Sequence, residues 1–145
     1  MSMERCFEER KLRHDRPDPL KAQKSVSAAE AKLGEAEKLA QAGFASASLL
    51  SAYSAMFHAG RALLFRDGVV EKSHYCLIAY LHEKYAETGK LNAGTITVMD
   101  AFREERHDVL YSLEGIAVRQ DDTKTAIDAA RKLIAAVKRL LKDGE

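Results

Sequence analysis

The sequence predicts an all-α fold, an antiparallel up-and-down bundle of four to five helices, and three observations support this. Apolar residues make up 46% of the 145 residues and charged residues 31%, which is typical of amphipathic helices. Only two prolines and eight glycines interrupt the chain. Apolar residues recur three and four positions apart over long stretches, and no segment shows the pattern of a β-strand.

We expect one domain at residues 18–145, preceded by an N-terminal arm or short helix at residues 1–17. A chain of this length can bury a sufficient core without metals or disulfides. The first core helix is predicted to begin at Asp18 and Pro19, because Asp caps free amide groups and Pro in the first turn loses no hydrogen bond. It should end at Gly43, which can take the left-handed conformation.

Four further helices follow. The second, about residues 45–66, is apolar nearly all round and should lie at the centre of the bundle. The third is expected from an N-cap at Ser73 to Gly89, the fourth over residues 95–111, and the fifth from Asp121 to the C-terminus. Connections of roughly 5 to 10 residues predict antiparallel neighbours.

Charge, cysteine usage and hydropathy exclude several classes of protein. Because 23 basic residues face 22 acidic ones, no overall positive field can hold a nucleic acid, and any such site must be a local cluster. Cys6 and Cys76 have the spacing of neither a metal site nor a disulfide framework, so we expect no metal and a reducing cytoplasm. The charged N-terminus and the lack of a stretch of about 20 apolar residues predict no membrane role.

The fourth helix carries the most informative polar residues. Arg103, Arg106 and His107 are three and four positions apart, so their side chains can project together as candidate catalytic residues. Arginine binds phosphate through two parallel hydrogen bonds, and histidine transfers protons near neutral pH. The alternative is a solvated helix face with local ion pairs, such as one between Asp100 and Arg103.

A second pair of candidates, His58 and Arg61, lies one turn apart in the apolar second helix. Arginine is almost never fully buried without a partner, so Arg61 should reach solvent, an acidic side chain or a bound anion. A purely structural role for His58 is the alternative, because a buried imidazole can hydrogen-bond to a carbonyl group.

Three stretches of the chain together resemble the HEPN domain family (higher eukaryotes and prokaryotes nucleotide-binding). They are Ala52-Tyr53-Ser54-Ala55-Met56-Phe57-His58-Ala59-Gly60-Arg61-Ala62-Leu63-Leu64, Lys72-Ser73-His74-Tyr75-Cys76-Leu77-Ile78 and the segment from Arg103 to Tyr111. The resemblance covers about residues 18–142. It implies a helical bundle that forms homodimers and often pairs with a minimal nucleotidyltransferase as toxin and antitoxin.

Many members of the family are implied to be metal-independent ribonucleases, with a His four to six residues beyond an Arg. Here only three residues separate Arg103 from His107, and no His follows Arg106 at that distance, so the resemblance does not decide whether the chain is an enzyme. The segment from Arg106 to Tyr111 is similar to the branch with an Arg and a later Tyr. The candidate binding residues are Arg61, His58, Asp108 and Tyr111.

The leading hypothesis is a module that binds a nucleotide or single-stranded RNA through its phosphates, needs no cofactor and pairs with a nucleotidyltransferase. The first alternative is a metal-independent endoribonuclease toxin that uses Arg103, Arg106 and His107. The second is a structural helical protein whose charged helix lines an interface or faces solvent.

Overall fold

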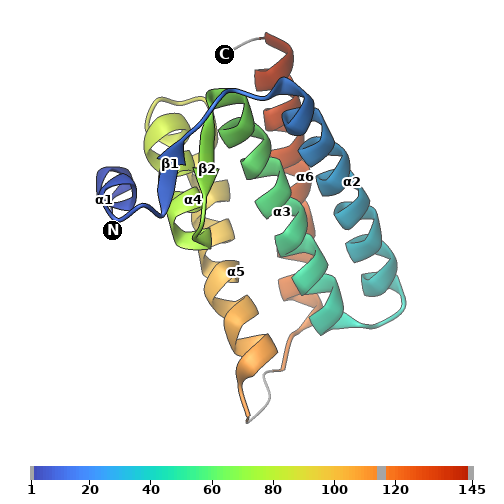
Figure 1. Cartoon of the computed structure of the whole chain (residues 1–145). Helices are drawn as coiled ribbons and strands as arrows, with labels where there is room; N and C mark the ends of the chain where they lie inside the picture. Colours follow the sequence, from blue (N-terminus) through green and yellow to red (C-terminus); the bar gives the residue numbers. More distant parts are fainter. Residues whose placement is uncertain (1, 114–116, 144–145) are drawn as a thin grey trace.

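The computed structural model describes residues 2–113 and 117–143, and four long helices form its body (Figure 1). These are α2 (Pro19–Gln41), α3 (Ala45–Asp67), α5 (Ala93–Tyr111) and α6 (Gln120–Asp143). As the apolar sequence of α3 predicts, this helix is central and packs against α2, α5 and α6. The expected all-α bundle is confirmed.

The helix ends form where capping residues allow them. Asp18 accepts a hydrogen bond from the backbone N–H of Lys21 (3.0 Å) at the start of α2, which confirms the predicted cap. Gly68 ends α3 with φ +76°, and a Cβ atom there would lie 2.6 Å from the carbonyl oxygen of Asp15. Only glycine therefore fits both this backbone conformation and this close approach.

A short two-stranded sheet corrects the expectation that no segment is a strand. Strands β1 (Leu12–His14) and β2 (Val69–Glu71) pair antiparallel, with Leu12 opposite Glu71. Three residues are too few to show an alternating pattern, and the pairing partner lies far away in the sequence. This sheet holds the N-terminal segment, including α1 (Met3–Glu8), beside the bundle (Figure 1).

The connection between the sheet and α5 is helical but not uniform. It consists of α4 (His74–Leu81), which begins at the predicted cap Ser73, and a π-helical turn, η1 (His82–Ala86). Cys76 in α4 forms a disulfide with Cys6 in α1, with their Cα atoms 5.8 Å apart. The expectation of no disulfide is therefore wrong, because the spacing of two cysteines along a chain does not show which elements the fold brings together.

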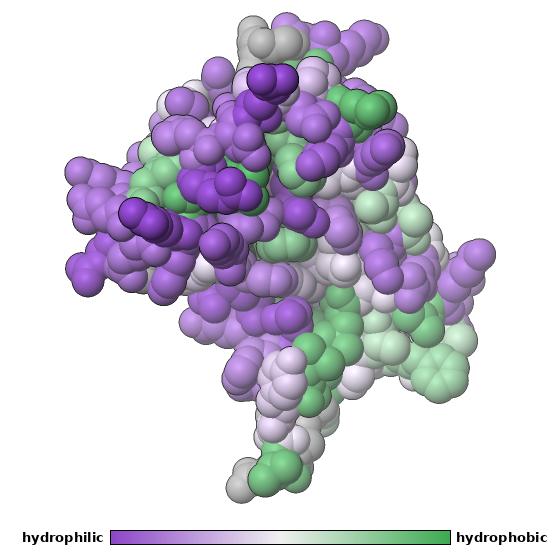
Figure 2. Space-filling model, in the orientation of Figure 1, coloured by the Kyte–Doolittle hydropathy of each residue, from purple (hydrophilic) through white to green (hydrophobic). Residues whose placement is uncertain are grey.

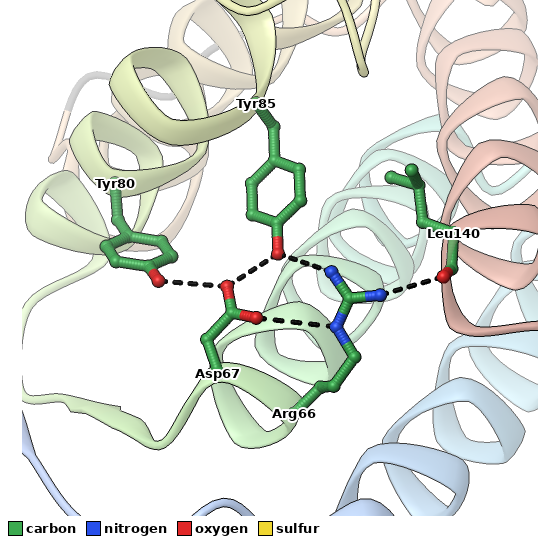
Figure 3. Close-up of polar contacts among 5 residues, drawn as sticks. All are labelled: Arg66, Asp67, Tyr80, Tyr85 and Leu140. Atoms are coloured by element: carbon green, nitrogen blue, oxygen red, sulfur yellow. Dashed lines mark hydrogen bonds and ion pairs between the residues drawn. The ribbon is translucent and has the colours of Figure 1, made fainter. Parts of the chain in front are cut away.

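A polar network ties the end of α3 to α4, η1 and α6 (Figure 3). Both Tyr80 (2.9 Å) and Tyr85 (2.5 Å) donate hydrogen bonds to Oδ2 of Asp67. Arg66 donates to the hydroxyl of Tyr85 and to the carbonyl oxygen of Leu140, each at 2.7 Å. Burial and the carboxylate of Asp67 raise the pKa values of both tyrosines, so their hydroxyls stay protonated as donors.

Of the large exposed apolar side chains among the described residues, all but Leu20 lie toward one end of the molecule. Figure 2 shows apolar residues at its lower end, over the end of α5 and near the turn between α2 and α3. The exposed side chains in these places are those of Phe44, Leu110, Tyr111 and Leu113. Within residues 2–113 and 117–143, none of the helices is both long and apolar enough to cross a membrane.

Candidate functional site

Two arginines of α5 lie over aromatic rings of α3 and α4. The guanidinium carbon of Arg106 is 5.7 Å from the ring centre of Tyr53, and that of Arg103 is 5.2 Å from the ring centre of Tyr75. The hydroxyl of Tyr53 is 2.9 Å from Nδ1 of His74. We call Tyr53, His74, Arg103 and Arg106 the arginine–histidine cluster.

Local sequence explains how three helices supply this cluster. Tyr53 and Phe57 are four residues apart on α3, so both rings face the same neighbour, and the ring of His74 stacks on Phe57 at a centroid distance of 4.1 Å. His74 is the first residue of α4, a position set by the cap at Ser73, whose side chain accepts a hydrogen bond from the backbone of Cys76. The cluster thus depends on how the helices pack and not on a contiguous motif.

The cluster holds a neutral histidine beside positive charge. Burial lowers the pKa of His74, and the charges of Arg106, Arg103 and Arg61 lower it further. Burial raises the pKa of Tyr53 to about 12, against the opposite effect of the two α5 arginines. At neutral pH His74 is therefore uncharged and can accept a proton, while Tyr53 remains a neutral hydroxyl that orients the imidazole.

The two α5 arginines differ in their ion pairs. Nε of Arg103 donates to Asp100 (2.9 Å), which is the local pair considered from the sequence, and Nη2 of Arg103 lies 3.5 Å from Glu104. Arg106 makes no ion pair with any carboxylate that the structure describes. Its half-buried guanidinium is therefore the part of the cluster with charge available for an anion.

The other predicted residues of α5 are exposed to solvent. His107 is exposed and its ring packs against the exposed ring of Tyr111, with centroids 5.0 Å apart. Asp108 is also exposed, and its charge contributes to a raised pKa of Glu105, after burial and the charge of Asp122. His74 is thus a second histidine near the α5 arginines, in addition to His107, which lies one helical turn from Arg103.

Arg61 and His58 occupy a different part of α3. Arg61 forms an ion pair with Glu71 of β2 (Nε–Oε1 2.7 Å), so an acidic partner explains how this arginine is accommodated. Its guanidinium also lies 5.1 Å from the ring centre of Phe65. Burial lowers the pKa of His58, and the positive charges of Arg61 and of Lys32 in α2 lower it further.

Sequence reasoning missed Tyr53 and His74 as parts of one site. They are 21 residues apart on two elements, and neither belongs to a motif with a fixed spacing to Arg106. The available signal was weak: a tyrosine and a phenylalanine four apart on α3, and a histidine directly after a capping serine. The structure also contains no group of three potential metal ligands among its described histidines, cysteines, aspartates and glutamates.

The model of the HEPN domain family matches residues 22–140. The chain belongs to the HEPN domain family. This match includes every residue of the arginine–histidine cluster and leaves α1 and β1 outside the matched part of the HEPN domain. No curated protein matches the chain.

Proposed function

We propose that this HEPN domain binds the phosphate groups of a nucleotide or single-stranded RNA at the arginine–histidine cluster. The observation that carries the proposal is Arg106, a half-buried guanidinium over the ring of Tyr53 with no ion pair to a described carboxylate. Guanidinium groups donate two parallel hydrogen bonds to phosphate oxygens and stack on aromatic faces. An anionic ligand would supply the partner that the protein does not.

The neighbouring side chains have distinct roles in this proposal. Asp100 holds the guanidinium of Arg103 through Nε and Glu104 lies 3.5 Å from Nη2, which leaves Nη1 for a second phosphate oxygen. Tyr53 fixes the imidazole of His74, which can donate a hydrogen bond to the phosphate from its other ring nitrogen. Recognition of this kind needs no base sequence, so we expect binding of phosphate-bearing ligands in general.

The test is the affinity of a fluorescently labelled single-stranded RNA for the wild type, Arg106→Ala and Arg131→Ala. Arg131 is the matched control, because it lies on α6 in surface ion pairs with Glu37 and Asp128, and its loss removes the same charge. We expect Arg106→Ala to weaken binding at least tenfold, equivalent to about 1.4 kcal/mol, and to reduce the salt dependence. Equal losses in both variants would contradict a site at Arg106 and indicate only general attraction.

We also propose, from family membership, that the domain forms homodimers and pairs with a minimal nucleotidyltransferase in a toxin–antitoxin-like system. The exposed Leu110, Tyr111 and Leu113 at the end of α5 offer an apolar surface for such an association. Light scattering of the wild type and of Leu110→Ser tests the homodimer, and copurification with a coexpressed nucleotidyltransferase tests the partner. A monomer that captures no such partner would contradict this part of the proposal.

A second candidate function, metal-independent RNA cleavage, is favoured by the neutral imidazole of His74 beside two arginines. In such a reaction the imidazole takes the proton of a ribose 2′-hydroxyl and the 2′-oxygen attacks phosphorus, forming a cyclic phosphate. The bond from phosphorus to the 5′-oxygen breaks, and this oxygen leaves with the proton that the imidazolium returns to it. The arginines would stabilise the negative charge on the transition state. His74, not His107, has the surroundings for this role.

Incubation of RNA with the purified protein in excess chelator tests this reaction, using His74→Gln and His107→Gln as a matched pair. Cleavage that His74→Gln abolishes and His107→Gln preserves would establish a ribonuclease with His74 as its base. Cleavage that His107→Gln abolishes would instead identify His107, the residue expected from the sequence, as the base. Binding of RNA without cleavage by the wild type would leave phosphate binding as the function.

A further inference from the structure

A cavity of about 220 Å³ lies between α4 with η1 on one side and α5 on the other. It adjoins the arginine–histidine cluster, because two of its lining residues, Tyr75 and Asp100, also contact Arg103. Tyr75 lies under the guanidinium and Asp100 accepts its Nε hydrogen bond. A ligand in the cavity would thus be next to a phosphate bound by the arginines.

The size and apolar lining of the cavity suit one flat heterocycle. Pockets for drug-sized molecules measure roughly 300–1,000 Å³, so this volume is too small for such a ligand or for a folded segment of another protein. Ile78 and Ala79 of α4 and Ile96 of α5 supply apolar surface. The ring of Tyr75 adds an aromatic surface of the kind on which nucleobases stack.

The polar lining of the cavity is rich in hydrogen-bond acceptors. Oε2 of Glu83 receives the backbone N–H of Met3 (2.6 Å), and Oε1 has no hydrogen bond with any described residue. The hydroxyl of Thr97 donates to the carbonyl of Ala93 (3.0 Å), so only its lone pairs remain for a ligand. His82 also lines the cavity, and its Nε2 lies 3.4 Å from Glu87, so the acceptors of Glu83 and Thr97 favour a ligand that presents N–H donors.

Of the nucleobases, guanine matches a carboxylate best. Its N1–H and its N2 amino group are adjacent donors on one edge, and a carboxylate accepts two parallel hydrogen bonds. Adenine and cytosine offer one amino group next to an acceptor, which faces a carboxylate unfavourably. Helix periodicity puts Glu83 about two turns beyond Tyr75, at the end of the cavity away from Arg103. In a nucleotide the N1 and N2 edge of guanine points away from the phosphate, so Glu83 lies where this edge would be.

We propose that this cavity binds the guanine base of a nucleotide whose phosphate lies at the arginine–histidine cluster, with Glu83 reading the guanine edge. The binding of the phosphate rests on the proposed function, while the binding of the base rests on the cavity alone. The ligand class is then a guanine nucleotide or a guanine in single-stranded RNA. Specificity would come from α4, η1 and α5 together.

The experiment measures binding of four ligands to the full chain by titration calorimetry and saturation-transfer NMR. Guanosine and inosine, which differ only in the N2 amino group, test the base site without phosphate, and ribose 5-phosphate tests the phosphate site without a base. Guanosine 5′-monophosphate tests both. The variants are Ala79→Leu, which fills the cavity, Glu83→Gln, which replaces one acceptor with an amide donor, and Arg106→Ala.

We expect guanosine 5′-monophosphate to bind at least tenfold more tightly than ribose 5-phosphate, and guanosine to bind more tightly than inosine. Ala79→Leu and Glu83→Gln should both remove the preference for guanine and leave the affinity for ribose 5-phosphate unchanged. Arg106→Ala should weaken the binding of ribose 5-phosphate and leave the preference for guanine unchanged. Thermal unfolding by circular dichroism identifies any variant that fails to fold. If Ala79→Leu fails to fold, Glu83→Gln still tests the base site.

The two proposals fail in different ways. Equal affinities of guanosine 5′-monophosphate and ribose 5-phosphate, or a preference that survives Glu83→Gln, would overturn the guanine site and leave phosphate binding standing. Binding of guanosine without binding of ribose 5-phosphate would overturn the proposed function and support the cavity. Absence of binding by all four ligands would overturn both.

Discussion

The hydroxyl of Tyr53 in α3 lies 2.9 Å from Nδ1 of His74, the first residue of α4, and this contact joins two helices at the candidate site. Both side chains are largely removed from solvent. Tyr53→Phe should therefore lower the free energy of unfolding by about 0.5–1.5 kcal/mol, the usual value of one hydrogen bond. Urea denaturation measures this loss, and Tyr111→Phe, at an exposed ring, is the control. An unchanged midpoint for Tyr53→Phe would show that the contact contributes nothing to stability.

The histidines predict how stability changes with pH. Burial and neighbouring positive charge lower the pKa values of His58 and His74 below the ordinary 6.5, so the unfolded chain binds protons that the folded protein does not. The contribution of the neutral histidines to the free energy of unfolding is thus fully present above about pH 6.5. It is lost as the pH falls from this value toward the lowered pKa values of the folded protein. Urea unfolding at pH 7.5 and 5.5 should show this fall, and His74→Gln should reduce it. An equal fall in His74→Gln would assign the effect to other groups.

The disulfide between Cys6 and Cys76 predicts a large effect of reduction. The bond closes a loop with a sequence separation of 70 residues, and loops of this size contribute typically about 2–4 kcal/mol by restricting the unfolded chain. Dithiothreitol or Cys6→Ser should lower the free energy of unfolding by that amount. Thiol titration in urea should find no reactive thiol before reduction and both cysteines afterwards. Two titratable thiols in the unreduced protein would contradict the bond.

The polar network at the end of α3 predicts that Asp67→Ala destabilises the protein. The substitution leaves the hydroxyls of Tyr80 and Tyr85 and the guanidinium of Arg66 without their carboxylate, so a loss of about 1–3 kcal/mol is expected. Asp128→Ala is the control, because its carboxylate lies in an exposed ion pair worth about 0–1 kcal/mol. Thermal and urea unfolding compare the two variants. Equal effects would show that the network adds no more than a surface pair.

The sequence was sufficient to predict the helical bundle and several helix ends, because these depend on local signals. Asp18 and Ser73 cap α2 and α4 through their own side chains, and Gly43 has the left-handed backbone expected of it (φ +85°). The β1–β2 pairing and the disulfide were missed because both join segments far apart in the chain. The cysteine pair also removes one reason to expect a reducing compartment, and a cytoplasmic location stays a prediction.

The candidate site was predictable only in the part that lies on one helix. Arg103 and Arg106 are three residues apart, so helix geometry alone brings them together. Which rings they meet depends on the packing of α3, α4 and α5, and no spacing in the sequence encodes it. For the same reason the sequence pointed to His107, which lies on the same helix as the arginines, and gave no sign of His74, which the packing of α4 brings near them.

The N-terminal segment also has a consequence for the order of events during synthesis. Cys6 leaves the ribosome 70 residues before Cys76, and β1 likewise precedes its partner β2. At roughly 5–20 residues per second, the segment must wait about 4–14 s before the chain that completes its sheet and its covalent bond exists. The segment is therefore made before the elements that hold it, and all of α2 and α3 leaves the ribosome in between.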